Sequence, residues 1–244
     1  MKNYKITVQY DGTKYNGWQR QGNTKNTIQE RFENVLSRMC GKDVDIFASG
    51  RTDAGVHADE QTANFKCETQ MTESDIHEYL NKYLPEDIRV TSINEADMRF
   101  HSRLNAVSKT YEYTIATEKP DVFIRKYVFF ADRKPDVEKM RSAAMLFTGK
   151  HDFRGFSSVG RTKKSTVRTV NFIEIEEKDS LIKIRINADG FLYNMVRIIA
   201  GTLYDIGIGA LEESVIEEVF EEKIRERAGV TLPASGLRLM KVYY

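Results

Sequence analysis

Residues that usually signal metal or disulfide chemistry are scarce in this sequence. It has two cysteines, Cys40 and Cys67, and four histidines. The cysteines lack the spacing of a metal-binding motif, and no two histidines form a His-x-x-x-His pair. We therefore expect no bound metal and no cofactor. In a reducing compartment, we expect each cysteine to be a buried free thiol.

Long hydrophobic runs are also missing. No apolar stretch is long enough to span a bilayer, and the first residues, Met1-Lys2-Asn3-Tyr4-Lys5, do not form a signal peptide. We therefore expect a cytoplasmic protein that is not associated with a membrane. The chain has 244 residues, of which 41% are hydrophobic. This suits one large domain or two small ones with a substantial core.

The net charge is only +1 at pH 7, whereas nucleic-acid-binding proteins usually carry a basic excess. The charges are nevertheless unevenly distributed. Glutamates gather between residues 212 and 222. Two clusters are basic, and they consist of Arg99, His101, Arg103 and Lys109, and of Arg161, Lys163, Lys164 and Arg168. Each basic cluster is either a solvated face or a binding surface for a polyanion, and composition leaves both open.

Hydrophobic periodicity predicts alternating strands and helices in the first hundred residues. Residues 4–10 alternate strictly, which is typical of a strand, and an apolar stripe over residues 28–39 predicts a helix. The elements expected next are strands at 44–47 and 62–66, a helix at 76–83 and a strand at 88–93. This β-α-β-β-α-β order is that of a ferredoxin-like unit.

The second half repeats this order approximately. The expected elements are strands at 110–115 and 127–130, a helix at 137–147, a hairpin of strands 170–175 and 181–186, a long helix from near Phe191, an acidic helix after Ser214 and a strand at 237–243. We therefore predict an α+β fold of two ferredoxin-like halves, with mostly antiparallel sheet and a central catalytic cleft. With a boundary near Asn105, residues 1–105 form an N-terminal domain, and residues 106–244 form a C-terminal domain that completes the cleft.

The most informative segment is a loop of small residues, 48–58, which presents one acid, Asp53, near one base, Arg51. Gly50 and Gly55 allow its backbone to turn tightly. The predicted strands hold the loop at both ends, and catalytic residues often lie on loops of this kind. From composition alone, Asp53 is more simply explained as a loop aspartate that makes an Asx turn.

Arg197 stands out on physical grounds, because its predicted helix is otherwise mostly apolar. Its neighbours include Met195, Val196, Ile198 and Ile199. The long side chain either reaches solvent or is buried beside an anionic partner, since an unpaired buried charge is very costly.

Longer motifs are spread along nearly the whole chain. They are Tyr10-Asp11-Gly12-Thr13, Gly17-Trp18-Gln19-Arg20, the segments 50–58, 99–103 and 108–113, His151-Asp152-Phe153, the segment 190–197 and Gly236-Leu237. In this order they resemble the motifs of the tRNA pseudouridine synthase A family. The segment 228–233 departs from the proline-richer pattern of that family.

The resemblance implies an isomerase, a tRNA pseudouridine(38–40) synthase, which converts uridine into pseudouridine at positions 38, 39 and 40 of the anticodon stem-loop. The expected partner is tRNA, bound through its anticodon arm by a homodimer, without a cofactor. Asp53 is implied as the catalytic nucleophile, paired with Arg197 from the other half. Tyr111 is implied to stack on the uracil.

Further residues are expected to bind the substrate. The resemblance implies that Arg51 helps to hold the target nucleotide out of its stack, since extruding a base costs a few kcal/mol. His101, Arg103 and Lys109 are basic residues that we expect to contact phosphates.

Two other classes of function remain as alternatives. Two ferredoxin-like units are also typical of non-catalytic RNA-binding modules, but those stack bases on an Arg/Lys-Gly-Phe-x-Phe strand that is absent here. A glycoside hydrolase would need a second carboxylate a few ångströms from Asp53. The loop offers only Asp59 and Glu60, on the wrong side of a tight turn.

Overall fold

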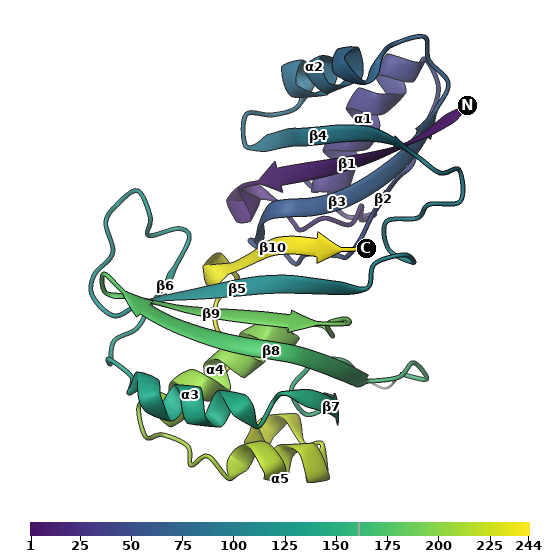
Figure 1. The fold of residues 1–244 in the computed structure, drawn as a ribbon. Helices are drawn as coiled ribbons and strands as arrows, with labels where there is room; N and C mark the ends of the chain where they lie inside the picture. Colours follow the sequence, from purple (N-terminus) through teal and green to yellow (C-terminus); the bar gives the residue numbers. More distant parts are fainter. Residues whose placement is uncertain (161) are drawn as a thin grey trace. The chain divides into compact units, whose positions relative to one another are not determined.

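The computed structural model describes residues 1–160 and 162–244. They form an α+β structure with mostly antiparallel sheet, as predicted (Figure 1). The chain divides into two compact units. Residues 1–107 and 238–244 make up the first unit, and residues 108–237 make up the second.

The first unit follows the predicted β-α-β-β-α-β order. Its elements are β1 (Lys2–Tyr10), α1 (Ile28–Cys40), β2 (Ile46–Ala48), β3 (His57–Cys67), α2 (Glu73–Tyr83) and β4 (Ile88–Ala96). The strands β4, β1 and β3 are antiparallel neighbours in that order, and β2 pairs with β3. The last strand, β10 (Leu237–Tyr243), runs parallel to β3 through Arg238 and Leu239.

Capping residues in the sequence account for where helix α1 begins and ends. Thr27 caps α1 by accepting a hydrogen bond from the Glu30 N–H, and Gly41 ends the helix in the left-handed conformation. The apolar stripe predicted for α1 is buried at Ile28, Phe32 and Leu36. α1 packs against α2 and β2, and α2 packs against β4 (Figure 1). The stripe therefore becomes part of the core.

The expectation of two free thiols is wrong. Cys40 and Cys67 form a disulfide, and their Cα atoms lie 6.6 Å apart. Each cysteine is the last residue of its element, α1 and β3 respectively. Because the two elements end side by side, their terminal side chains meet within disulfide range. The separation of 27 residues in the sequence gave no sign of this.

The described part of the second unit is built from further strands and α-helices. They are β5 (Ser108–Ala116), β6 (Phe129–Phe130), α3 (Val137–Met145), β7 (Gly149–Asp152), β8 (Val167–Lys178), β9 (Leu181–Ala188), α4 (Met195–Gly207) and α5 (Val215–Glu222). β5, β9, β8 and β7 are antiparallel neighbours in that order, and β6 lies parallel beside β5. The predicted hairpin is confirmed as β8 and β9.

One predicted boundary in this unit needs correction, and one strand was not predicted. The long helix α4 begins at Met195, not near Phe191, because Asn194 adopts a left-handed backbone with φ of 60°. The chain from Phe191 to Asn194 is consequently a turn that leads into the helix. The short strand β7 was not predicted, because Gly149–Asp152 has no apolar alternation and forms a strand only through its pairing with β8.

No helix in the described part of the chain combines the length and the apolar character that crossing a membrane requires.

Candidate active site

The loop that carries Asp53 connects β2 to β3 and is tied to β3 where it begins. The Ser49 N–H donates to the Thr62 carbonyl over 2.8 Å. The Ser49 hydroxyl donates to Gln61 Oε1 over 2.7 Å, and Gln61 Nε2 donates to the Gly50 carbonyl over 2.9 Å. Ser49 and Gln61 are fully buried, so these bonds are shielded from water.

A second segment, residues 12–18, holds the other side of the loop. The Trp18 N–H donates to the Thr52 carbonyl over 3.0 Å, and the Gly55 N–H donates to the Tyr15 carbonyl over 3.3 Å. The hydroxyls of Tyr10 and Thr52 lie 2.8 Å apart. Two motifs that are about forty residues apart in the sequence thus form one structure around Asp53.

Glycine is required where these two segments meet. A Cβ atom on Gly17, whose φ is +84°, would lie 2.5 Å from the Thr52 carbonyl oxygen. A Cβ atom on Gly12 would lie 2.0 Å from the Val56 carbonyl oxygen. Any side chain at either position would push the Asp53 loop away, which explains both glycines of the motif.

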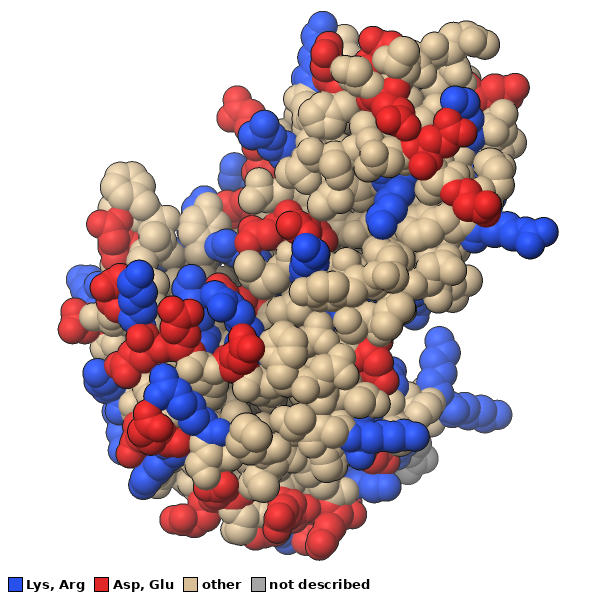
Figure 2. All heavy atoms as spheres, viewed as in Figure 1, with Lys and Arg blue, Asp and Glu red and all other residues tan. Residues whose placement is uncertain are grey.

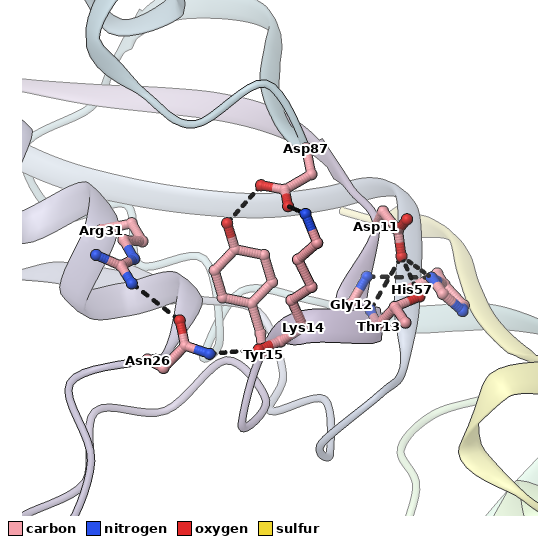
Figure 3. Close-up of polar contacts among 9 residues, drawn as sticks. All are labelled: Asp11, Gly12, Thr13, Lys14, Tyr15, Asn26, Arg31, His57 and Asp87. Carbon is pink, nitrogen blue, oxygen red and sulfur yellow. Dashed lines mark hydrogen bonds and ion pairs between the residues drawn. The ribbon is translucent and has the colours of Figure 1, made fainter. Parts of the chain in front are cut away.

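His57 and Tyr15 anchor this arrangement (Figure 3). The buried His57 ring accepts a hydrogen bond at Nδ1 from the Gly12 N–H over 3.1 Å, and the same nitrogen lies 3.3 Å from Asp11 Oδ1. The Tyr15 hydroxyl donates to Asp87 over 2.5 Å. His57 therefore packs the loop against Gly12 and Asp11.

The main chain of Asp53 closes a turn. Its carbonyl accepts a hydrogen bond from the Val56 N–H over 3.1 Å, and Gly55 takes a φ of +80° within the turn. Asp53 is half-buried. The backbone that carries the carboxylate is consequently held on a short turn, with β3 on one side and residues 12–18 on the other.

Three further predicted site residues lie on the first unit. Arg51 and Arg103 are exposed, and His101 is half-buried. The His101 ring lies 5.2 Å from the Phe47 ring, and its Nδ1 accepts a hydrogen bond from the Arg103 N–H over 3.1 Å. Because the ring is held in this way, His101 is a fixed part of the loop that follows β4.

Tyr111 lies on β5 of the second unit, opposite Ile186 of β9. The edge of its ring meets the ring of Phe191, with centroids 4.9 Å apart and planes at 77°. Phe191, which the sequence pattern places at the start of a helix, lies before α4 and packs on Tyr111 instead. Tyr113, two residues along, is a core residue, and burial raises the pKa of its hydroxyl.

Arg197 lies on α4 of the second unit and is half-buried. Its Nε donates to the Leu232 carbonyl over 2.6 Å, and its Nη1 donates to Asn194 Oδ1 over 2.8 Å. Among the described residues, no hydrogen bond or ion pair involves its Nη2. Two fixed contacts therefore orient the guanidinium, whereas a side chain that merely reached solvent would have none.

The predicted site residues are thus divided between the units. Asp53, Arg51, His101 and Arg103 belong to the first unit, and Tyr111, Lys109 and Arg197 belong to the second. A pair between Asp53 and Arg197 would join the two units, and it stays a prediction.

The second basic cluster lies around the connection between β7 and β8. Arg161 lies outside the described residues, Lys163 and Lys164 are exposed, and Arg168 donates to the Ser165 and Val167 carbonyls. Lysine and arginine side chains project beside this connection in Figure 2, whereas acidic side chains gather over α5. The described residues of this cluster and the glutamates of α5 therefore lie on different segments of the second unit.

His151 and Asp152 do not form a catalytic dyad. The His151 ring stacks on Phe220 at 4.5 Å, while Asp152 binds Thr166 and the Lys223 ammonium. Within residues 1–160 and 162–244, no three histidine, cysteine, aspartate or glutamate side chains come together as a metal site would require.

Comparison with known proteins gives consistent matches along almost the whole chain. The family model of tRNA pseudouridine synthase matches residues 6–105 and 143–244. A Bacillus cereus protein named tRNA pseudouridine synthase A 2 is 44% identical and covers 100% of both chains. Proteins named tRNA pseudouridine synthase A are 47% identical in Bacillus sp. (strain KSM-64), over 98% of both chains, and 44% identical in Clostridium kluyveri, over 100% of both.

A solved structure, the archaeal box H/ACA sRNP Nop10-Cbf5 complex, matches 97% of this chain and 48% of that chain, with 13% identity and a TM-score of 0.40. The sequence relatives define the class of protein, an isomerase that acts on uridines in tRNA. The chain belongs to the tRNA pseudouridine synthase family.

Proposed function

We propose that the chain converts uridine into pseudouridine at positions 38, 39 and 40 of the tRNA anticodon stem-loop, with Asp53 as the nucleophile. The observation that carries this proposal is the support of the Asp53 turn. Main-chain hydrogen bonds from Trp18 and Gly55 and the buried pair Ser49–Gln61 hold the turn from both sides. A nucleophile benefits from such support, because small misplacements of a reacting group cost large factors in rate.

The proposed reaction needs one carboxylate and no redox partner. Asp53 attacks an electrophilic carbon of the nucleotide, either ribose C1′ or uracil C6. The bond between C1′ and N1 breaks, the uracil turns, and a bond forms between C1′ and C5. The proton on C5 is lost, N1 gains a proton, and the carboxylate is released. Substrate and product have the same composition, so the reaction is an isomerisation.

The target uridine must leave its stack before Asp53 can reach it. Extrusion of a base costs a few kcal/mol, which the protein has to offset. Arg51 is exposed two residues before Asp53, and its planar cation is suited to fill the vacated space. Tyr111 presents a ring already held by Phe191, and we propose that the extruded uracil stacks on it.

Arg197 is the residue that we propose as the partner of Asp53. Its Nε and Nη1 are already bound to Leu232 and Asn194. Nη2 is then the nitrogen that serves the carboxylate. A guanidinium beside Asp53 would keep the carboxylate ionised and correctly aimed.

We further propose that the enzyme binds the anticodon arm as a homodimer in the cytoplasm. Because tRNA is long, a symmetric pair of subunits would present a larger basic surface to its backbone. Light scattering after size exclusion tests this: a dimer mass supports the proposal, and a monomer that is fully active contradicts it.

Release of tritium from tRNA labelled at uridine C5 tests the proposed function. Isomerisation releases the label while the base stays attached. A non-catalytic RNA-binding module would release nothing, and a glycoside hydrolase would free uracil. tRNAs that lack uridine at positions 38, 39 and 40 should give no release, and release from them would contradict the proposed positions.

Replacing Tyr111 by alanine should weaken tRNA binding and abolish most turnover. The loss of base stacking costs about 1–3 kcal/mol, because the ring that receives the uracil is removed. Tyr111→Phe should bind normally, since the ring face remains, and should lose activity only if the hydroxyl handles a proton. Tyr83→Ala, which removes an exposed ring on α2, serves as the control. Wild-type behaviour of Tyr111→Ala would place Tyr111 outside the site.

Binding of tRNA should depend steeply on salt. If about four to eight phosphates are neutralised, affinity falls by orders of magnitude between low and moderate salt. Arg103→Ala and Lys164→Ala should each lower the slope of log affinity against log salt by about one. Lys2→Ala removes a lysine paired with Glu95 and should leave the slope unchanged. A flat salt response of the wild type would exclude both basic clusters as RNA contacts.

A further inference from the structure

The segment Gly229–Leu232, here called the strap, lies along α4 and is tied to it from end to end. The Gly229 N–H donates to Thr202 Oγ1 over 3.0 Å, and the Val230 N–H donates to Asp205 Oδ2 over 3.0 Å. At the other end, the Leu232 N–H donates to the Arg197 carbonyl over 3.3 Å. The strap therefore runs antiparallel to the helix, over two of its turns.

The strap touches the helix backbone directly. A Cβ atom on Gly201 would lie 1.8 Å from the Val230 carbonyl oxygen, and one on Gly229 would lie 2.5 Å from the Thr202 Cα. Helix and strap thus need a glycine each at the point of contact. A glycine in the middle of a helix lowers its stability, so its presence on α4 indicates that the close approach is required.

A clip made by Arg225 holds the outer side of the strap. Its Nη1 donates to the Gly229 carbonyl over 3.0 Å, and its Nη2 donates to Thr231 Oγ1 over 2.7 Å. Burial raises the pKa of Asp205 and lowers the pKa of Arg225. Both charged groups are partly buried, and each binds the backbone of the strap. Asp205 accepts from the Val230 N–H, and Arg225 donates to the Gly229 carbonyl.

The end of the strap meets Arg197. The Leu232 carbonyl accepts the hydrogen bond from Arg197 Nε over 2.6 Å, while the Leu232 N–H binds the carbonyl of the same arginine. Arginine has a long, flexible side chain. Its Nε–H bond to Leu232 and its Nη1 bond to Asn194 define the plane of the guanidinium.

We propose that the strap is a device that aims the Arg197 guanidinium, and that Thr202, Asp205 and Arg225 are positioning residues for the isomerisation. The proposal rests on the proposed role of Arg197 beside Asp53. The strap holds the Leu232 carbonyl, Leu232 holds Nε, and the plane of the Arg197 guanidinium is thereby fixed for its proposed role. The three positioning residues act on the reaction through the strap and Arg197, because their hydrogen bonds hold the strap.

Paired substitutions test the strap through its hydrogen bonds. Asp205→Ala and Thr202→Val each remove one acceptor, and we expect kcat to fall about 10- to 100-fold with the KM for tRNA unchanged. Asp205→Asn and Thr202→Ser restore an acceptor oxygen and should recover most of the activity. Thr117→Val removes the bond from Thr117 Oγ1 to the Ser180 carbonyl elsewhere in the unit, and it controls for lost stability.

An NMR signal from Arg197 reports on the orientation of its side chain independently of turnover. The ¹H–¹⁵N signal of Arg197 Nε, assigned by its loss in Arg197→Lys, should be sharp and slow to exchange in the wild type. It should broaden or shift in Asp205→Ala and Thr202→Val, but not in Thr117→Val. An unchanged signal together with unchanged kcat would overturn the strap proposal, and so would a loss of kcat no greater than that of the control. A changed signal with unchanged kcat would instead contradict the proposed role of Arg197.

Discussion

Replacing Asp53 by asparagine is expected to abolish pseudouridine formation while tRNA affinity stays within about tenfold of the wild type. A nucleophile acts mainly in the transition state, so its loss affects kcat far more than binding. The turn should survive the change, because it is closed by the main-chain bond from the Val56 N–H to the Asp53 carbonyl. Tritium release and filter binding, measured on the same preparation, separate the two effects.

Asp59 supplies a matched control for this experiment. It lies six residues further on, at 3.4 Å from Arg238 in a partly exposed ion pair, which is worth less than about 1 kcal/mol. Asp59→Asn should therefore keep nearly full activity. Turnover of Asp53→Asn above about one per cent of the wild type would remove Asp53 from the role of nucleophile. Loss of activity in Asp59→Asn would instead support the glycoside hydrolase alternative, which needs a second carboxylate near Asp53.

Replacing Arg197 by alanine should cripple catalysis and also weaken the fold. The substitution leaves the Leu232 carbonyl without its Nε donor and frees Asn194, which costs about 1–3 kcal/mol in the free energy of unfolding. Without the guanidinium, Asp53 is free to rotate or to take up a proton. Arg197→Lys should rescue only part of the activity, because an ammonium cannot make two directed contacts at once.

A double-mutant cycle decides whether Arg197 acts through Asp53. Unfolding free energies of Arg197→Ala, Asp53→Ala and the double variant should show a coupling above roughly 0.5 kcal/mol. Arg185→Ala is the control: it breaks an ion pair with Glu112 at 2.8 Å on the same unit and should leave turnover intact. Additive stabilities together with an active Arg197→Ala enzyme would show that the two residues do not act as a pair.

The sequence by itself determined the local elements and the family. The strict alternation of residues 4–10 and the apolar stripe of α1 predicted their elements correctly, because each periodicity reflects a single face turned toward the core. The hairpin of β8 and β9 and the acidic helix α5 were equally readable. The motifs along the chain identified the family, which composition and net charge did not indicate.

Tertiary structure decided which distant segments touch. The Trp18–Thr52 bond, the Cys40–Cys67 disulfide and the bond from Arg197 to Leu232 each join residues about thirty positions apart. No local pattern encodes such a meeting, since it depends on how whole elements end and pack. Gly17 and Gly201 look like ordinary glycines in the sequence, and only the folded chain shows a carbonyl oxygen in the space that a Cβ atom would fill.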